Sequence, residues 1–201
     1  MRISGEDLLA DMKSQHLAFV EAANPHSWFL TADTLHSQAC ALYERRGQSY
    51  LTQRDNQGVV GEWDGTARSF FLLGGFALEN ALKSFLVFEN PHWISNGVLS
   101  KRLRTHSLSN LRAMSKLTPY KIRYAKMLST FEAGLESWAR YPCALSFTEA
   151  MTAQNLSDHL WADYRLLMRA YGNRLQRLLE RGWTGPHGFY CRWEFSGQWF
   201  E

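Results

Sequence analysis

One segment constrains the fold of this chain more than any other: residues 66–88 are apolar around almost the whole circumference of a helix. Large apolar side chains, such as Leu78 and Leu86, recur there at nearly every position. A helix with so little polar surface is usually central in a fold. Its apolar middle carries two charged residues, Glu79 and Lys83, one helical turn apart. Because burying unpaired charges is costly, these two residues either form an ion pair or line a polar surface.

Helical periodicity predicts further helices on both sides of this segment. Apolar residues repeat at helical spacing up to Asn24-Pro25, and again from Trp28 to a stop at Gly47. Residues 48–65 have no clear period and form either a small hairpin or a mobile loop. Three later helices are predicted, over residues 105–117, 119–139 (with Thr118-Pro119 as its start) and 157–181. The predicted fold class is therefore all-α, an antiparallel bundle of about five or six helices.

The last 19 residues differ in composition from the rest, because seven of them are aromatic. A disordered tail is rarely so aromatic. We therefore divide the chain into a helical bundle over residues 1–182 and an aromatic-rich C-terminal tail over residues 183–201. The tail is expected to pack back on the bundle, to form a short hairpin, or to contact a partner subunit.

Composition narrows the possible classes of protein. A net charge of +3 permits a nucleic-acid partner without requiring one. Cys40, Cys143 and Cys191 lack the spacing of a zinc site or a disulfide framework, so three reduced thiols in a cytoplasmic protein are expected. We expect no signal peptide and no membrane span of roughly 20 apolar residues. The histidines and glycines match no metal-binding or nucleotide-loop motif, so neither a metal nor a cofactor is expected.

A basic cluster follows the central helix. Lys101, Arg102, Arg104 and His106 stand where the next helix is predicted to begin. Helix N-termini bind anions, and a histidine there can also act as a general base or simply cap the helix. Arg140, at the end of the following helix, either complements the helix dipole or lies at the rim of the same polar site. The predicted ligand-binding residues are Glu79, Lys83, Arg104, His106 and Arg140.

Two short stretches carry a resemblance to a known family. The sequence GFALENALK at residues 75–83 and the sequence THSLSNL at residues 105–111 resemble the motifs of HEPN domains (higher eukaryotes and prokaryotes nucleotide-binding). The matching positions are Glu79, Leu82 and Lys83 in the first motif and His106, Leu108 and Leu111 in the second. Thr105 and Ser107 replace the glycine and the aspartate of the second motif. The resemblance covers roughly residues 65–180.

The resemblance implies an antiparallel helical bundle, often a homodimer, in bacterial defence, toxin–antitoxin or nucleotidyltransferase-associated systems. Many HEPN proteins are metal-independent RNases with an arginine and a histidine separated by four to six residues. Arg181 and His187 have that spacing but lie at a helix end and in a turn, whereas Arg102 and His106 are one residue short of it. The chain therefore looks more like a non-nuclease HEPN protein that binds a nucleotide, RNA, a phosphate-bearing ligand or a partner protein.

Three functions remain open at this point. The leading one is a binding module. The second is an RNase in which His106 is the general base and Arg102 or Arg104 stabilises the transition state, or in which His187 and Arg181 take these roles. The third is a structural subunit that assembles through its aromatic tail.

Overall fold

The computed structural model of this chain describes residues 5–141, 145–146 and 157–201. The protein is mostly helical, and the described residues also form two small two-stranded sheets. The predicted helical character is confirmed, but the all-α class is wrong in part because two hairpins are present. Cys143 lies outside the described residues, and Cys40 and Cys191 are free thiols.

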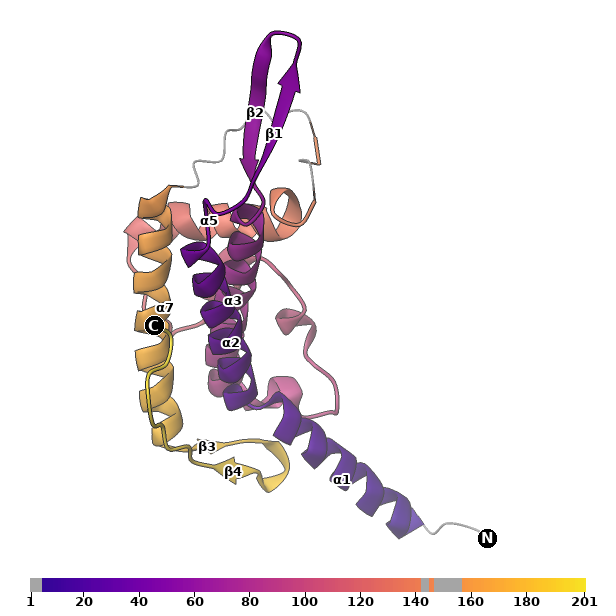
Figure 1. Ribbon diagram of the computed structural model, residues 1–201. Helices are drawn as coiled ribbons and strands as arrows, with labels where there is room; N and C mark the ends of the chain where they lie inside the picture. Colours follow the sequence, from indigo (N-terminus) through magenta and orange to yellow (C-terminus); the bar gives the residue numbers. More distant parts are fainter. Residues whose placement is uncertain (1–4, 142–144, 147–156) are drawn as a thin grey trace.

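The first two helices meet at the predicted Asn24-Pro25 junction. Helix α1 (Gly5–Ala23) extends away from the body, and α2 (Pro25–Glu44) begins directly after it (Figure 1). The side chain of Asn24 accepts a hydrogen bond from the Ser27 amide at 3.2 Å. Proline has no amide hydrogen to leave unpaired at a first helical position, so the same dipeptide ends one helix and starts the next.

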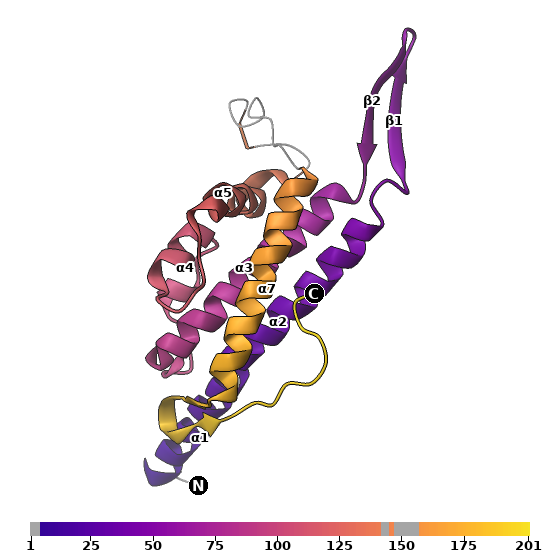
Figure 2. The same ribbon diagram turned by 90° about the vertical axis from the view of Figure 1, so that its left-hand side faces the viewer.

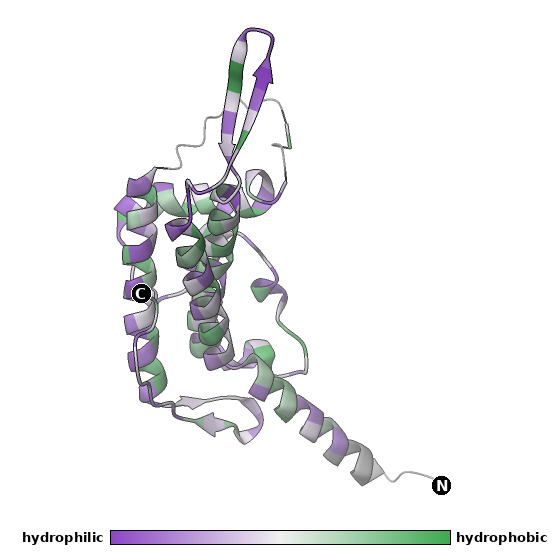
Figure 3. Ribbon diagram, viewed as in Figure 1, coloured by the Kyte–Doolittle hydropathy of each residue, from purple (hydrophilic) through white to green (hydrophobic). Residues whose placement is uncertain are grey.

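Helix α3 (Ala67–Glu89) is the centre of the fold, as its apolar circumference predicts. It runs antiparallel to α2, while α7 (Asp158–Glu180) packs on both and runs in the same direction as α3 (Figure 2). The outer side of α7 is hydrophilic and its inner side is hydrophobic (Figure 3). Helix α3 also has the length and apolar composition of a membrane span, contrary to expectation, but 78% of its most apolar window is buried inside the protein.

The region after α3 differs most from the prediction. Two short 3-10 turns, η1 (Pro91–Ile94) and η2 (Lys101–Leu103), precede α4 (Leu108–Met114). A further 3-10 turn, η3 (Ile122–Tyr124), leads into α5 (Ala125–Ala133), which continues as a π-helical turn, Gly134–Trp138.

Thr118-Pro119 does not start a helix, contrary to the prediction. The carboxylate of Glu89, at the end of α3, accepts hydrogen bonds from the Ser115 hydroxyl and from the amides of Lys116 and Leu117. These contacts hold the chain after α4 in a bent, non-helical course. The helix therefore begins several residues later, at η3.

Residues 48–65 form the hairpin that was one of the two predicted alternatives. Strand β1 (Tyr50–Asp55) pairs antiparallel with β2 (Gly58–Asp64), and the hairpin projects from the end of the α2–α3 pair (Figure 1). Its side chains are almost all exposed. The hairpin therefore links α2 to α3 without adding to the core.

The tail forms a short hairpin and also packs back on the helices. Strands β3 (Trp183–Thr184) and β4 (Tyr190–Cys191) pair, and the chain then returns along α2 and α7 (Figure 2). Phe200 is only 1% exposed. A Cβ atom at Gly172 of α7 would lie 2.7 Å from Phe200 Cδ2, so the close approach of the tail requires glycine there. Contact with a partner subunit stays a prediction.

Candidate functional site

Three of the five predicted ligand-binding residues come together in one cluster. Lys83 Nζ lies 2.5 Å from Glu79 Oε1, and His106 Nδ1 lies 2.8 Å from Glu79 Oε2. Glu79 and Lys83 are 4% and 5% exposed, whereas the His106 side chain is 56% exposed. The cluster therefore runs from a buried ion pair on α3 to an imidazole at the surface. It is called the His106 cluster below.

The segment that carries His106 is fixed by a second carboxylate. Glu132 of α5 accepts hydrogen bonds from the Ser107 hydroxyl and from both the hydroxyl and the amide of Ser109. Burial acts to raise the pKa of Glu132, but these hydrogen bonds outweigh it and the pKa is lowered. Glu132 therefore fixes this segment from a different helix.

The hydrogen bond to Glu79 decides how His106 presents its ring. A carboxylate at Nδ1 favours the tautomer with its proton on Nδ1, which leaves Nε2 as the acceptor. Within the described residues no hydrogen bond involves Nε2. Lys83 stabilises the negative charge of Glu79, and its ammonium also lies 5.5 Å from the ring centre of Trp28. The cluster can therefore accept a proton, or a hydrogen bond from a ligand, at its surface.

The other predicted residues are not part of this cluster. The Arg102 guanidinium lies over the Trp93 ring, 5.3 Å from its centre. Arg104 Nε donates a hydrogen bond to the Leu99 carbonyl at 3.1 Å, and Arg140 lies over Tyr141. Among the described residues no interaction links Arg102, Arg104 or Arg140 to Glu79, Lys83 or His106. The expectation of one site lined by all of them is therefore not met.

The second arginine–histidine pair is also separated. His187 lies in the 3-10 turn η5 (Pro186–Gly188) with a positive φ of 58°, and its Nε2 contacts the Ser95 carbonyl at 2.5 Å. Arg181 is the residue that follows α7. No described interaction joins the two side chains, so the structure gives this pair no common site.

A small apolar pocket lies beside the His106 cluster. Its volume is about 280 Å³, and Trp28, which contacts Lys83, is one of its walls. The lining residues are Phe19, Ala22, Ala23, Ser27, Trp28, Thr31, Asn80 and Leu99. With so few polar groups, it suits an apolar group of a ligand better than a phosphate.

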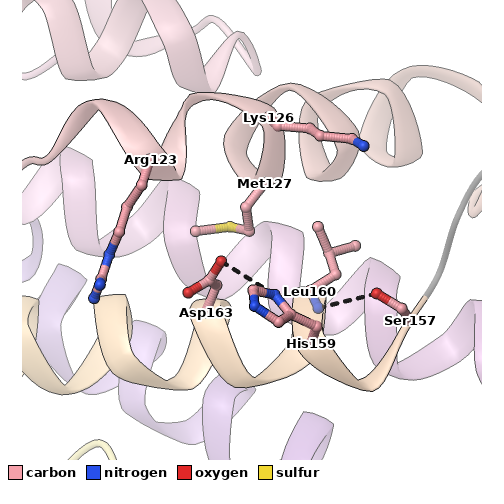
Figure 4. A pocket seen from close by; sticks show the side chains of 7 residues that line it. All are labelled: Arg123, Lys126, Met127, Ser157, His159, Leu160 and Asp163. Carbon is pink, nitrogen blue, oxygen red and sulfur yellow. Dashed lines mark hydrogen bonds and ion pairs between the residues drawn. The ribbon is translucent and has the colours of Figure 1, made fainter.

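A larger, polar cleft was missed by the sequence reasoning. It lies between the η3–α5 segment and the first turns of α7, and its volume is about 470 Å³ (Figure 4). The lining residues are Arg123, Lys126, Met127, Ser157, His159, Leu160 and Asp163. We call it the α5–α7 cleft. The one signal in the sequence is the helical i, i+4 spacing of His159 and Asp163, whose Nδ1 and Oδ2 atoms lie 3.6 Å apart.

Neither polar site has the composition of a metal centre. Within the described ranges no group of three or more histidine, cysteine, aspartate or glutamate side chains is placed to hold a metal ion. Comparisons with protein-family models, with curated proteins and with solved structures found no match to this chain. The functional assignment therefore rests on the residues of the chain itself.

Proposed function

We propose that the protein is a HEPN-like helical binding module, an antiparallel bundle that takes a nucleotide or another phosphate-bearing ligand. The cellular setting we propose is a cytoplasmic bacterial defence or toxin–antitoxin-type system, with the protein acting as a homodimer. The observation that carries the proposal is the His106 cluster. In it, Glu79, which is paired with Lys83, holds His106 at the surface, and all three residues are among those shared with the HEPN motifs.

Energetic reasoning supports a role beyond packing. Two buried charges and their polar partners rarely stabilise a fold more than apolar residues of the same volume do. A buried carboxylate that orients an exposed imidazole is, by contrast, a common way to prepare a histidine for binding or proton transfer. Arg104 lies two residues before His106, is exposed, and uses only Nε in its described hydrogen bond. Its remaining N–H groups are suited to a phosphate.

The same geometry favours one second candidate, a metal-independent RNase. With Nδ1 held by Glu79, His106 Nε2 is the atom that would remove the proton from a ribose 2′-hydroxyl. Arg102 or Arg104 would then stabilise the charge that develops on the phosphate. Both arginines would have to leave the contacts they now make with Trp93 and Leu99. This requirement makes the RNase the second candidate rather than the first.

The first experiment compares wild type with His106→Ala, using His92→Ala as a control that removes another exposed histidine. We expect ATP to raise the melting temperature of wild type and of His92→Ala, because a ligand that binds only the native state stabilises it. ATP should raise that of His106→Ala much less. No shift in wild type, or an equal shift in all three proteins, would contradict the proposed site.

A parallel assay separates the two candidates. Each protein is incubated with a mixed RNA pool in EDTA. Cleavage by wild type and by His92→Ala, lost in His106→Ala, would establish the RNase. If ATP binds and RNA stays intact, the binding module stands. If neither occurs, the structural subunit is left, and changing Trp193 and Trp199 to serine should then dissociate the oligomer in size-exclusion chromatography.

A further inference from the structure

The α5–α7 cleft carries a distribution of charge that the His106 cluster lacks. Arg123 and Lys126 come from the η3–α5 side and are exposed; Arg123 extends toward α7 at one end of the cleft, and Lys126 points toward the other end (Figure 4). His159 comes from the opposite side. In the His106 cluster Lys83 is neutralised by Glu79 at 2.5 Å, whereas two permanent cations of the cleft share one carboxylate, Asp163.

Asp158, which precedes His159 in the sequence, does not neutralise the cations of the cleft. Asp158 accepts a hydrogen bond from the Tyr43 hydroxyl at 2.7 Å and pairs with Arg46 at 3.4 Å. Those partners belong to α2 and to the residues that follow it, and Asp158 is not among the residues that line the cleft. The cleft therefore keeps an excess of positive charge, to which the N-terminal end of the α7 dipole adds.

One of the two cations is held in place before any ligand arrives. Arg123 Nη2 donates a hydrogen bond to the Tyr124 hydroxyl at 2.7 Å, and the guanidinium lies 4.8 Å from the centre of the same ring. This hydrogen bond raises the pKa of Arg123. A guanidinium fixed by one N–H keeps its other N–H groups for an oxyanion, and less side-chain entropy is lost on binding.

The remaining lining separates the two cations with apolar surface. In Figure 4 the Arg123 guanidinium lies at one end of the cleft and the Lys126 ammonium points toward the other, with Met127 and Leu160 in between. A volume of about 470 Å³ falls within the usual range of small-molecule sites, roughly 300–1,000 Å³. These features fit a ligand that has a strongly anionic group and an uncharged organic body.

We propose that the α5–α7 cleft is a second binding site, specific for a phosphate-bearing organic anion. Arg123 binds its phosphate oxygens at one end of the cleft, Lys126 and His159 bind further oxygen atoms of the ligand, and Met127 and Leu160 contact the organic body that lies between the two cations. The site acts independently of the His106 cluster. A failure of this proposal would not affect the function proposed for the His106 cluster, and the reverse also holds.

The test is isothermal titration calorimetry with two probes, ADP and inorganic pyrophosphate. Four proteins are compared: wild type, Arg123→Ala/Lys126→Ala, His106→Ala, and the control Lys13→Ala/Arg45→Ala, which removes the same charge from exposed positions elsewhere. We expect the cleft variant to lose one ADP-binding step, or to show it with at least tenfold lower affinity, while any binding of ADP at the His106 cluster remains. In the control and in His106→Ala, the affinity of the cleft for ADP should be unchanged. Melting curves of the unliganded proteins establish that each variant is folded.

Several results would overturn the proposal. Absence of binding of both probes to wild type would do so, as would equal affinity of wild type and the cleft variant. An ADP affinity that falls in His106→Ala but not in the cleft variant would leave the function proposed for the His106 cluster and remove the second site. Equal affinities of wild type for ADP and pyrophosphate would overturn the role of Met127 and Leu160 in binding an organic body.

Discussion

His36 and His106 each use the same ring nitrogen, Nδ1, for a hydrogen bond of 2.8 Å, but the two surroundings have opposite electrostatic characters. The partner of His106 is a buried carboxylate that already carries a lysine. The partner of His36 is the neutral hydroxyl of Tyr164, inside the core between α2 and α7. The environment of His106 stabilises charge at the surface, whereas the environment of His36 disfavours it.

His36 and its neighbours Cys40 and Tyr164, called the His36 cluster below, show how burial changes the pKa values of ionisable side chains. Burial above all, helped by Arg165 and Arg169, lowers the pKa of His36 to about 4 against a backbone contact with Glu201 that raises it. Cys40 Sγ lies 3.7 Å from His36 Nε2, a spacing that suggests a nucleophile and its base. Burial nevertheless raises the pKa of Cys40, so the thiol stays protonated. The short distance between Cys40 and His36 therefore does not by itself make the thiol reactive.

The largest effect is expected from Glu79→Ala. The substitution leaves the buried ammonium of Lys83 without its counterion, so the free energy of unfolding should fall by about 3–5 kcal/mol in urea titrations at pH 7. Replacing both residues, as Glu79→Leu/Lys83→Met, should recover most of the loss. A cost below about 1 kcal/mol for Glu79→Ala would mean that Lys83 reaches water, and the contrast between a charged and a neutral cluster would be lost.

The second prediction concerns His36: a fall in pH should lower the free energy of unfolding. The pKa of His36 is about 4 in the folded protein and about 6.5 when unfolded, so the unfolded state binds the proton more readily. The contribution of neutral His36 is fully present above pH 6.5 and is lost as the pH falls toward 4, by about 3 kcal/mol. Urea titrations at pH 7, 5.5 and 4 measure it. In His36→Phe the decline should be smaller by that amount, and equal declines in both proteins would contradict the assignment.

The smallest effect is expected from His106→Ala. Its side chain is half exposed, and Lys83 continues to neutralise Glu79 after the imidazole is removed. Loss of one hydrogen bond to the carboxylate should lower the free energy of unfolding by about 1 kcal/mol, measured by the same urea titration. A loss as large as that of Glu79→Ala would show that His106 is a structural residue. The RNA and ATP assays with this variant would then have to be repeated with His106→Gln.

Sequence reasoning succeeded where the signal is local. The apolar period of residues 66–88 predicted α3 to within one residue at each end, and the turn-spaced Glu79 and Lys83 do form an ion pair. It was wrong at Thr118-Pro119 because Glu89, 28 positions before Leu117, takes the amide hydrogens of this segment. Such a contact leaves no trace in local periodicity.

The composition of the site was only partly predictable for the same reason. Arg102 and Arg104 shortly precede His106 in the sequence, but they lie in and directly after a 3-10 turn, and their side chains contact Trp93 and Leu99. The α5–α7 cleft joins Arg123 to His159, two residues from different helices. Only the packing of α5 on α7 brings them together.

The docking of Phe200 also has a consequence for the order of folding. Its amide donates a hydrogen bond to Asp33, 167 positions earlier, and its ring stacks on His36. At about 5–20 residues per second, synthesis of these two positions is separated by roughly 10–30 s. During that interval the aromatic cover over His36 does not exist, and the surface of α2 that it will occupy is open to water or to a chaperone. The surroundings of His36, which exclude charge, are thus completed only well after α2 itself has been synthesised.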